Sequence, residues 1–180
     1  MLSALGPSDV KITNYGVLEN PKHDYGPVRG NRRLTERRIR NTQDWKLNRL
    51  MEEFPRGESL ARQCAHWVRA VVGLHFFPDA NHRTAFGTLY GLLDATGVAP
   101  PNDEWPPDGI ETAVLRSKLL RGLHCRTDFR TLWLRDELNR HWHGFFKRSL
   151  HGASSHDDEL PSKESLRDIL EYARDRRGGR

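Results

Sequence analysis

Two helical apolar patterns, separated by a short polar stretch, constrain the fold of this chain more than any other feature. After Ser59, apolar side chains recur at i, i+3 and i+4, which predicts a helix over 60–74 with one buried face. A second pattern predicts a helix over 84–96, which Gly97 is placed to end. These patterns are formed by Leu60, Ala61, Cys64, Trp67, Val68, Val71 and Val72, and by Phe86, Leu89, Tyr90 and Leu93.

The rest of the chain adds further helices around this pair. Residues 110–123 and 129–146 are amphipathic, with Leu134, Leu138, Trp142 and Phe145 on the apolar face of the second segment. Residues 34–53 have loosely helical spacing before the break at "FPRG", and 162–174 predict a last helix. We therefore expect an all-α helical bundle.

The ends of the chain are expected to differ from this bundle. Residues 1–33 form an N-terminal segment, 34–150 the helical core, and 151–180 a polar loop, a helix and a basic tail. The alternating patch "VKITNYGVL" predicts a short strand or one arm of a small β-hairpin. With 180 residues, the chain has the length of one domain with a single buried core.

Charge and cysteine usage limit the partners. The 29 Lys and Arg residues outnumber the 24 Asp and Glu residues, and a net charge of +5 favours anionic partners such as nucleotides, nucleic acid or acidic protein surfaces. The two cysteines fit neither a disulfide framework nor a CxxC metal site. No apolar run approaches the roughly 18 residues of a membrane span, and no secretory pattern opens the chain, so we expect a cytoplasmic protein.

The polar stretch "HFFPDANHRTAF", residues 75–86, collects groups that handle phosphate. It precedes a predicted helix, whose first amides and positive dipole end attract anions, and the small Ala80 lets an anion approach the backbone. Arg83 adds a forked cationic donor, and Asn81 fixes the loop or donates a further hydrogen bond. Asp79 suits a Mg²⁺ ion that bridges phosphates, and His75 can accept a proton near neutral pH.

Each of these residues also has a purely structural interpretation. A histidine at a helix end is often a structural hydrogen-bonding group, Asp79 and Asn81 are good turn and cap residues, and Arg83 can be a surface charge. Residue types alone therefore leave the choice between a phosphate site and a polar turn open.

The order of these residues resembles the signature of the Fic/Doc family, HxFx(D/E)(G/A)N(G/K)R. The matching positions are His75, Phe77, Asp79, Ala80, Asn81 and Arg83. The resemblance covers residues 59–97 and is nearer to the Doc branch. It implies transfer of a phosphate or AMP group from ATP, with Mg²⁺, to a Ser, Thr or Tyr hydroxyl of a target protein.

The same resemblance implies roles for the matching residues. His75 would be the general base, Asp79 the Mg²⁺ ligand, and Asn81 and Arg83 would hold phosphates with backbone help from Ala80 and His82. Phe77 would pack inward and anchor the loop. The family also uses a flap before the core to align the target, for which residues 10–26 are the only candidate.

Two departures from the signature affect how a nucleotide would sit. His82 replaces the usual Gly or Lys and is bulkier than glycine, so the direction in which the nucleotide lies depends on where the His82 side chain goes. Phe86 removes the second arginine of AMP-transferring members, which favours phosphate transfer slightly over AMP transfer.

Two further features of the sequence concern regulation and an alternative function. No autoinhibitory S/TxxxE(G/N) copy lies on a predicted helix, so control by a separate antitoxin protein is the hypothesis. The basic run "RGNRRLTERRIR" supports the alternative, a catalytically degenerate nucleotide- or nucleic-acid-binding module.

Overall fold

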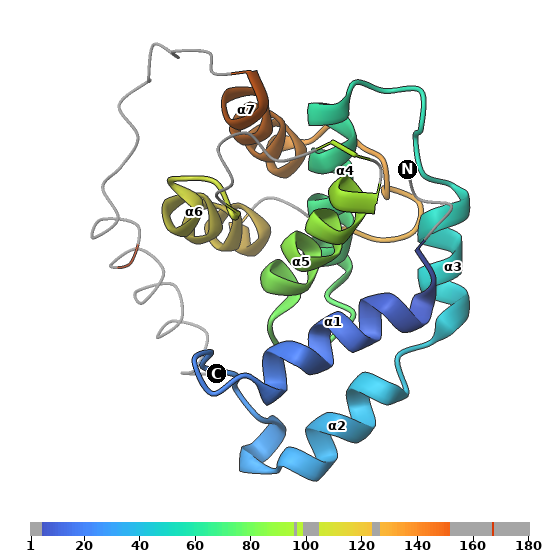
Figure 1. Ribbon diagram of the computed structural model, residues 1–180, viewed down its shortest axis with the longest axis vertical. Coiled ribbons are helices and arrows are strands. Elements are labelled where there is room, and N and C mark those ends of the chain that lie inside the picture. Colours follow the sequence, from blue (N-terminus) through green and yellow to red (C-terminus); the bar gives the residue numbers. More distant parts are fainter. Residues whose placement is uncertain (1–4, 96, 99–104, 124–126, 152–166, 168–180) are drawn as a thin grey trace.

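The computed structural model describes residues 5–95, 97–98, 105–123, 127–151 and 167, and this part of the chain is all-helical, as predicted (Figure 1). The helix predicted over 162–174 lies outside the described residues, apart from Arg167. Among the described residues, no helix is long and apolar enough to cross a bilayer. The helices are α1 (Pro7–Glu19), α2 (Arg32–Arg40), α3 (Asp44–Glu52), α4 (Leu60–Leu74), α5 (Asn81–Ala95), α6 (Ile110–Leu123) and α7 (Glu137–His151), with a short 3₁₀ turn at Val28–Gly30.

Helix α4 is the centre of the fold. It packs against both α5 and α7, and ten of its fifteen residues are buried. The predicted bounds, 60–74, are confirmed. Ser59 occupies the N-cap position, but its side chain makes no capping hydrogen bond; its carbonyl accepts from the Gln63 amide at 2.8 Å instead.

The prediction of a strand or hairpin arm at "VKITNYGVL" is wrong, because this patch lies inside helix α1. Val10, Asn14 and Val17 recur at helical spacing and are buried, and α1 packs against α5 and α2 (Figure 1). Gly87 of α5 lets the two helices come close, since a Cβ there would lie 2.8 Å from Thr13 Cγ2. Burial of this face overrides the strand preference of its β-branched residues.

Two further predicted boundaries need correction. The stretch 34–53 forms two helices, α2 and α3, separated at residues 41–43. The segment predicted as helical over 129–146 becomes helical only at Glu137. Before it, Asp128 Oδ1 accepts hydrogen bonds from the amides of Arg130 and Thr131 and holds a turn, and Leu134 is 54% exposed rather than buried.

Helices α5 and α6 largely follow the sequence pattern. Helix α6 has the predicted bounds, and α5 ends at Ala95, with Gly97 in the left-handed region at φ 67°. The Val98 amide bonds the Leu93 carbonyl at 2.9 Å, the outer bond of a Schellman motif. Tyr90, however, is 47% exposed and does not join Phe86, Leu89 and Leu93 in the interior.

A buried ion pair fixes the start of α7 onto α4. Arg69 is fully buried, and its guanidinium donates to both carboxylate oxygens of Asp136 at 2.8 and 2.6 Å. It also donates to the carbonyls of Thr131 and Leu132, both at 2.8 Å. Arg69 therefore secures the irregular stretch that leads into α7.

Candidate phosphate site at the start of helix α5

The segment between α4 and α5 bends at two residues with left-handed backbone conformation. His75 ends α4 at φ 51° and ψ 56°, and Ala80, at φ 59°, precedes the first residue of α5. The Thr84 amide bonds the Ala80 carbonyl at 2.8 Å, so residues 81–83 already form the first helical turn. Helix α5 thus begins three residues before the predicted Thr84, and its free first amides belong to Asn81, His82 and Arg83.

Asn81 fixes the loop, which was one of the two roles expected of it. Its side chain is buried, its Oδ1 accepts from the Phe77 amide at 3.1 Å, and its Nδ2 donates to the Phe77 carbonyl at 2.9 Å. Phe77 itself is 1% exposed, which confirms its predicted inward packing. These two contacts determine the shape of the loop.

Asp79 ties the loop to the segment that precedes α2. Its Oδ1 accepts from the Ala80 amide at 2.6 Å, and its Oδ2 accepts from the Gly26 amide at 2.7 Å. Each carboxylate oxygen keeps a second lone pair. No cluster of three metal-ligating side chains occurs within the described residues, so a Mg²⁺ ion here would take one protein carboxylate. Phosphates and water would have to complete its shell, a ligand set common for Mg²⁺.

A polar network from α1 holds the same loop from beneath. Asn14 is fully buried and donates to the Asp79 carbonyl at 3.0 Å and to Thr84 Oγ1 at 2.7 Å. Its Oδ1 accepts from the Tyr25 hydroxyl at 3.0 Å, and burial raises the pKa of Tyr25 to about 12. Sequence reasoning missed Asn14 and Tyr25 because the former was placed on a strand.

Arg83 is exposed at the edge of the loop and is joined to the segment before α2. Its Nη1 donates to the Asp24 carbonyl at 2.8 Å. Together with the Gly26–Asp79 contact, this bond brings residues 24–26 against the start of α5. The flap candidate, residues 10–26, therefore consists of most of α1 and the loop that follows it, not of a hairpin.

The His82 side chain lies against α6 and α7. Its Nε2 is 2.9 Å from Ser117 Oγ, and its ring centroid lies 6.0 Å from that of Trp142. Burial, helped by the charges of Lys118 and Arg121, lowers the pKa of His82 to about 3, so the ring is neutral. Because the His82 ring contacts these two helices, an anion at this position would bind the backbone amide of His82 and not its side chain.

Phe86, the second departure from the motif, belongs to the interior. Its side chain is 5% exposed, and its ring lies within 5.5–6.1 Å of four aromatic rings. These rings belong to Trp105, Trp142, Phe145 and Phe146. A cationic side chain at this position would lose its hydration inside an aromatic cluster.

His75 is solvent-exposed, yet its surroundings favour the neutral ring. Desolvation by the neighbouring protein lowers the pKa of His75 below its usual 6.5, and the charge of Arg121 lowers it further. Asp79 acts in the opposite direction. A neutral imidazole at neutral pH is the form that can accept a proton.

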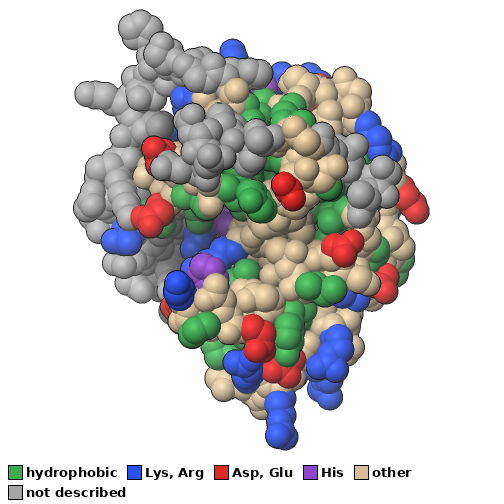
Figure 2. All heavy atoms as spheres, in the orientation of Figure 1, with side chains coloured by type: hydrophobic (Ala, Val, Ile, Leu, Met, Phe, Trp, Pro, Cys, Tyr) green, Lys and Arg blue, Asp and Glu red, His purple; other side chains and the backbone are tan. Residues whose placement is uncertain are grey.

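His75, the segment Asp79–Arg83 and Phe86 all line one cleft with a volume of about 1520 Å³. One wall holds His75 and the segment Asp79–Arg83, and helix α6 contributes the opposite wall with Lys118 and Arg121. Figure 2 shows histidine and Lys or Arg side chains together in a hollow on this face. Sequence reasoning missed Lys118 and Arg121; their spacing of three residues on a predicted helix was the available signal.

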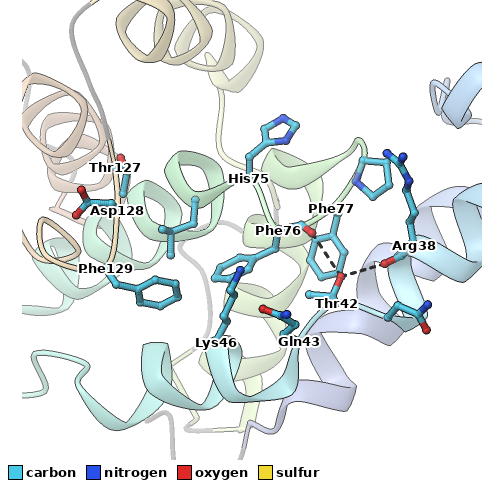
Figure 3. A pocket seen from close by; sticks show the side chains of 13 residues that line it. Arg38, Thr42, Gln43, Lys46, His75, Phe76, Phe77, Thr127, Asp128 and Phe129 are labelled. Atoms are coloured by element: carbon cyan, nitrogen blue, oxygen red, sulfur yellow. Dashed lines mark hydrogen bonds between the residues drawn. The ribbon is translucent and has the colours of Figure 1, made fainter.

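A smaller pocket, of about 760 Å³, lies on the other side of the segment 75–78 (Figure 3). Its walls come from the junction of α2 and α3, from the end of α4 and from residues 127–129. Gly73 permits this last stretch to approach α4, since a Cβ there would lie 2.2 Å from Thr127 Oγ1. His75 lines both this pocket and the larger cleft.

Comparison of the chain with protein-family models, curated proteins and solved structures finds no match.

Proposed function

We propose that this chain is a Fic/Doc-like transferase that moves a phosphate or AMP group from ATP to a Ser, Thr or Tyr hydroxyl of a cytoplasmic target protein. One observation carries the proposal. The motif residues His75, Asp79, Ala80, Asn81 and Arg83 lie together where a loop with two left-handed residues, His75 and Ala80, meets the start of α5, and they line a cleft of about 1520 Å³. A nucleotide-sized ligand fits such a volume.

The cleft offers a polyphosphate several kinds of donor. The first backbone amides of α5 and the positive end of its helix dipole lie at the loop 75–80, and Arg83 belongs to the same first turn. Lys118 and Arg121 line the opposite wall, within the same cleft. The phosphate chain would therefore lie between the start of α5 and helix α6, with its charge balanced from both sides.

His75 would act as the general base. Its neutral imidazole would accept the proton of the target hydroxyl while that oxygen attacks the phosphorus. In phosphate transfer, the bond from the γ-phosphorus to the bridging oxygen breaks and ADP leaves. In AMP transfer, attack occurs at the α-phosphorus and pyrophosphate leaves. A Mg²⁺ ion on Asp79 would supply positive charge between the phosphates.

Phosphate transfer is slightly preferred over AMP transfer. The second arginine of AMP-transferring enzymes is absent, and its position, Phe86, is packed among aromatic rings. A toxin role under the control of a separate antitoxin protein completes the proposal.

The deciding experiment uses ATP labelled separately at the α and γ phosphates. The purified protein is incubated with cell lysate and Mg²⁺, without antitoxin. γ-Label on a protein band identifies a kinase, and α-label identifies AMP transfer. His75→Ala should abolish labelling while the circular dichroism spectrum stays unchanged. Absence of both labels with the unaltered protein would refute the enzymatic proposal.

One observation favours a second candidate, a catalytically degenerate module that binds nucleic acid. Arg33, Arg37, Arg38 and Arg40 of α2 are all exposed, and none forms an ion pair within the described residues. Salt-sensitive binding to mixed RNA or DNA that persists in His75→Ala, together with a lack of transfer, would support this candidate.

A further inference from the structure

The smaller pocket has a chemical character of its own. Its apolar part is formed by Leu74, Phe76 and Phe129, and two cationic side chains, Arg38 and Lys46, line it as well. Figure 3 shows Phe129 at one end and Arg38 at the other, with Lys46 rising from α3 beside Phe76. The pocket therefore combines an apolar surface with positive charge.

The positive charge of this pocket is only partly neutralised from within. Arg38 and Lys46 form no ion pair with any residue that the structure describes. The carboxylate in the lining belongs to Asp128, and its Oδ1 accepts from the backbone amides of Arg130 and Thr131. Those two hydrogen bonds lower the pKa of Asp128, so it stays ionised, and two cations against one anion leave the lining with a net positive charge. A ligand with a negative charge would complement the two cations.

The position of the pocket suggests what kind of ligand enters it. A transfer reaction needs a donor and an acceptor that approach the base from different directions. The larger cleft collects the groups suited to the phosphate donor, and the smaller pocket lies across the segment 75–78 from it. His75 lines both, and Figure 3 shows its imidazole turned away from Phe76 and Lys46. A protein segment seated in the smaller pocket therefore lies next to residue 75, and its acceptor hydroxyl reaches past the segment 75–78 to the ring.

We propose that the pocket between α2, α3 and residues 127–129 binds the segment of the target protein that flanks the acceptor hydroxyl. It selects a segment with an acidic residue next to an aromatic or large aliphatic one. The carboxylate pairs with Lys46, the apolar side chain packs beside it on Phe76 and Phe129, and Arg38 adds positive charge at the other end of the pocket. The inference rests on the proposed transferase function and specifies its substrate.

The strength of this selection follows from the exposure of the cations. Arg38 is exposed and Lys46 is half-buried, so the attraction of each cation for the target is partly screened by water. Exchange of an attracted acidic residue for a repelled basic one beside Lys46 gives a preference of about tenfold. A volume of about 760 Å³ accommodates two or three side chains rather than a folded domain.

The test compares fluorescein-labelled peptide pools by anisotropy, so that its readout does not depend on catalysis. One pool carries Glu and Phe around a central Ser, and the other carries Lys and Phe. The unaltered protein should bind the acidic pool about tenfold more tightly. The charge-reversed variant Arg38→Glu/Lys46→Glu should prefer the basic pool.

A matched control separates the pocket from the general charge of the protein. Arg33→Glu/Arg37→Glu changes the net charge by the same amount on exposed positions of α2 that do not line the pocket. This control should keep the preference for acidic peptides. Equal binding of both pools, or a preference that survives reversal at Arg38 and Lys46, would overturn the inference. Tighter binding of a single-stranded RNA oligonucleotide than of the acidic pool, lost on that reversal, would also overturn it.

The same variants distinguish failure of the inference from failure of the proposed function. If the peptide preference switches as expected but no label passes from ATP to any protein, the transferase proposal fails and the peptide site stands. If transfer occurs and depends on His75, but the pools bind equally, the transferase proposal stands and the pocket assignment fails.

Discussion

Replacement of Arg69 by methionine should strongly destabilise the fold, because it leaves a buried carboxylate without its cation. Arg69 is fully buried and Asp136 side-chain exposure is 12%. Breaking a buried ion pair by removing one partner costs about 3–5 kcal/mol. The carbonyls of Thr131 and Leu132 also lose their donor, at about 1 kcal/mol each. Because water can reach part of Asp136, we expect a loss at the lower end of the combined range, about 5 kcal/mol.

Urea denaturation followed by circular dichroism measures this loss directly. In thermal melts, the same loss corresponds to roughly 10–20 °C for a chain of this length. Asp136→Asn is an informative partner variant, since it removes the charge but retains an oxygen that can accept from the Asn139 amide at the start of α7. Asp136→Ala should cost about 1 kcal/mol more, the value of the lost cap.

A double-mutant cycle decides whether the ion pair is the cause. Arg69→Met/Asp136→Leu should be less destabilised than the sum of its single variants, because no unpaired charge remains. Strictly additive losses, or a loss below about 1.5 kcal/mol for Arg69→Met, would refute this account of the α4–α7 contact.

Three further predictions concern the candidate site and the buried histidines. Arg121→Gln should move the acidic limb of the pH–rate profile to higher pH, because Arg121 lowers the pKa of His75; a limb that does not move argues against His75 as the base. Ala80→Gly should change stability by less than about 0.5 kcal/mol in urea titrations, since relief of the φ 59° strain offsets the lost methyl, whereas Ala80→Val should cost more than about 2 kcal/mol. Burial lowers the pKa of His66 to about 4 and of His82 to about 3, so the unfolded chain binds more protons below about pH 6.5. The free energy of unfolding from urea titrations should therefore decrease as the pH is lowered from about 6.5 to about 4, by up to about 1.4 kcal/mol per pH unit for each histidine. A free energy that does not change over this range would contradict the burial of both histidines in the neutral form.

The helices that could be predicted from the sequence are those whose apolar stripe is unbroken. Helix α4 has apolar residues at nearly every inward position, and helix α6 begins directly after a Pro- and Gly-rich stretch, so both were placed with their observed bounds. Helix α1 was missed because the polar Asn14 interrupts its buried face. The two-residue spacing of Val10 and Ile12, and of Tyr15 and Val17, favours a strand in the sequence, whereas in the helix Ile12 and Tyr15 are exposed.

In the candidate site, too, the local sequence predicts some features and contacts between distant segments determine others. The order from His75 to Arg83 predicts a phosphate site, and the structure places these residues at the start of α5. The groups that hold the turn come from distant segments, such as Gly26 on Asp79. A hydrogen bond between residues 53 positions apart produces no periodic pattern from which a single sequence could predict it.

The two departures from the motif share a structural cause. His82 and Phe86 lie one helical turn apart on α5, and both face the aromatic ring of Trp142 on α7. Once these positions pack against α7, neither can present a cation to a phosphate. Lys118 and Arg121 of α6 line the same cleft and can provide that charge from the opposite wall. The lack of cations at these positions of α5 and their presence on α6 are therefore two aspects of one arrangement, in which α7 packs on one side of α5 and α6 completes the proposed phosphate site.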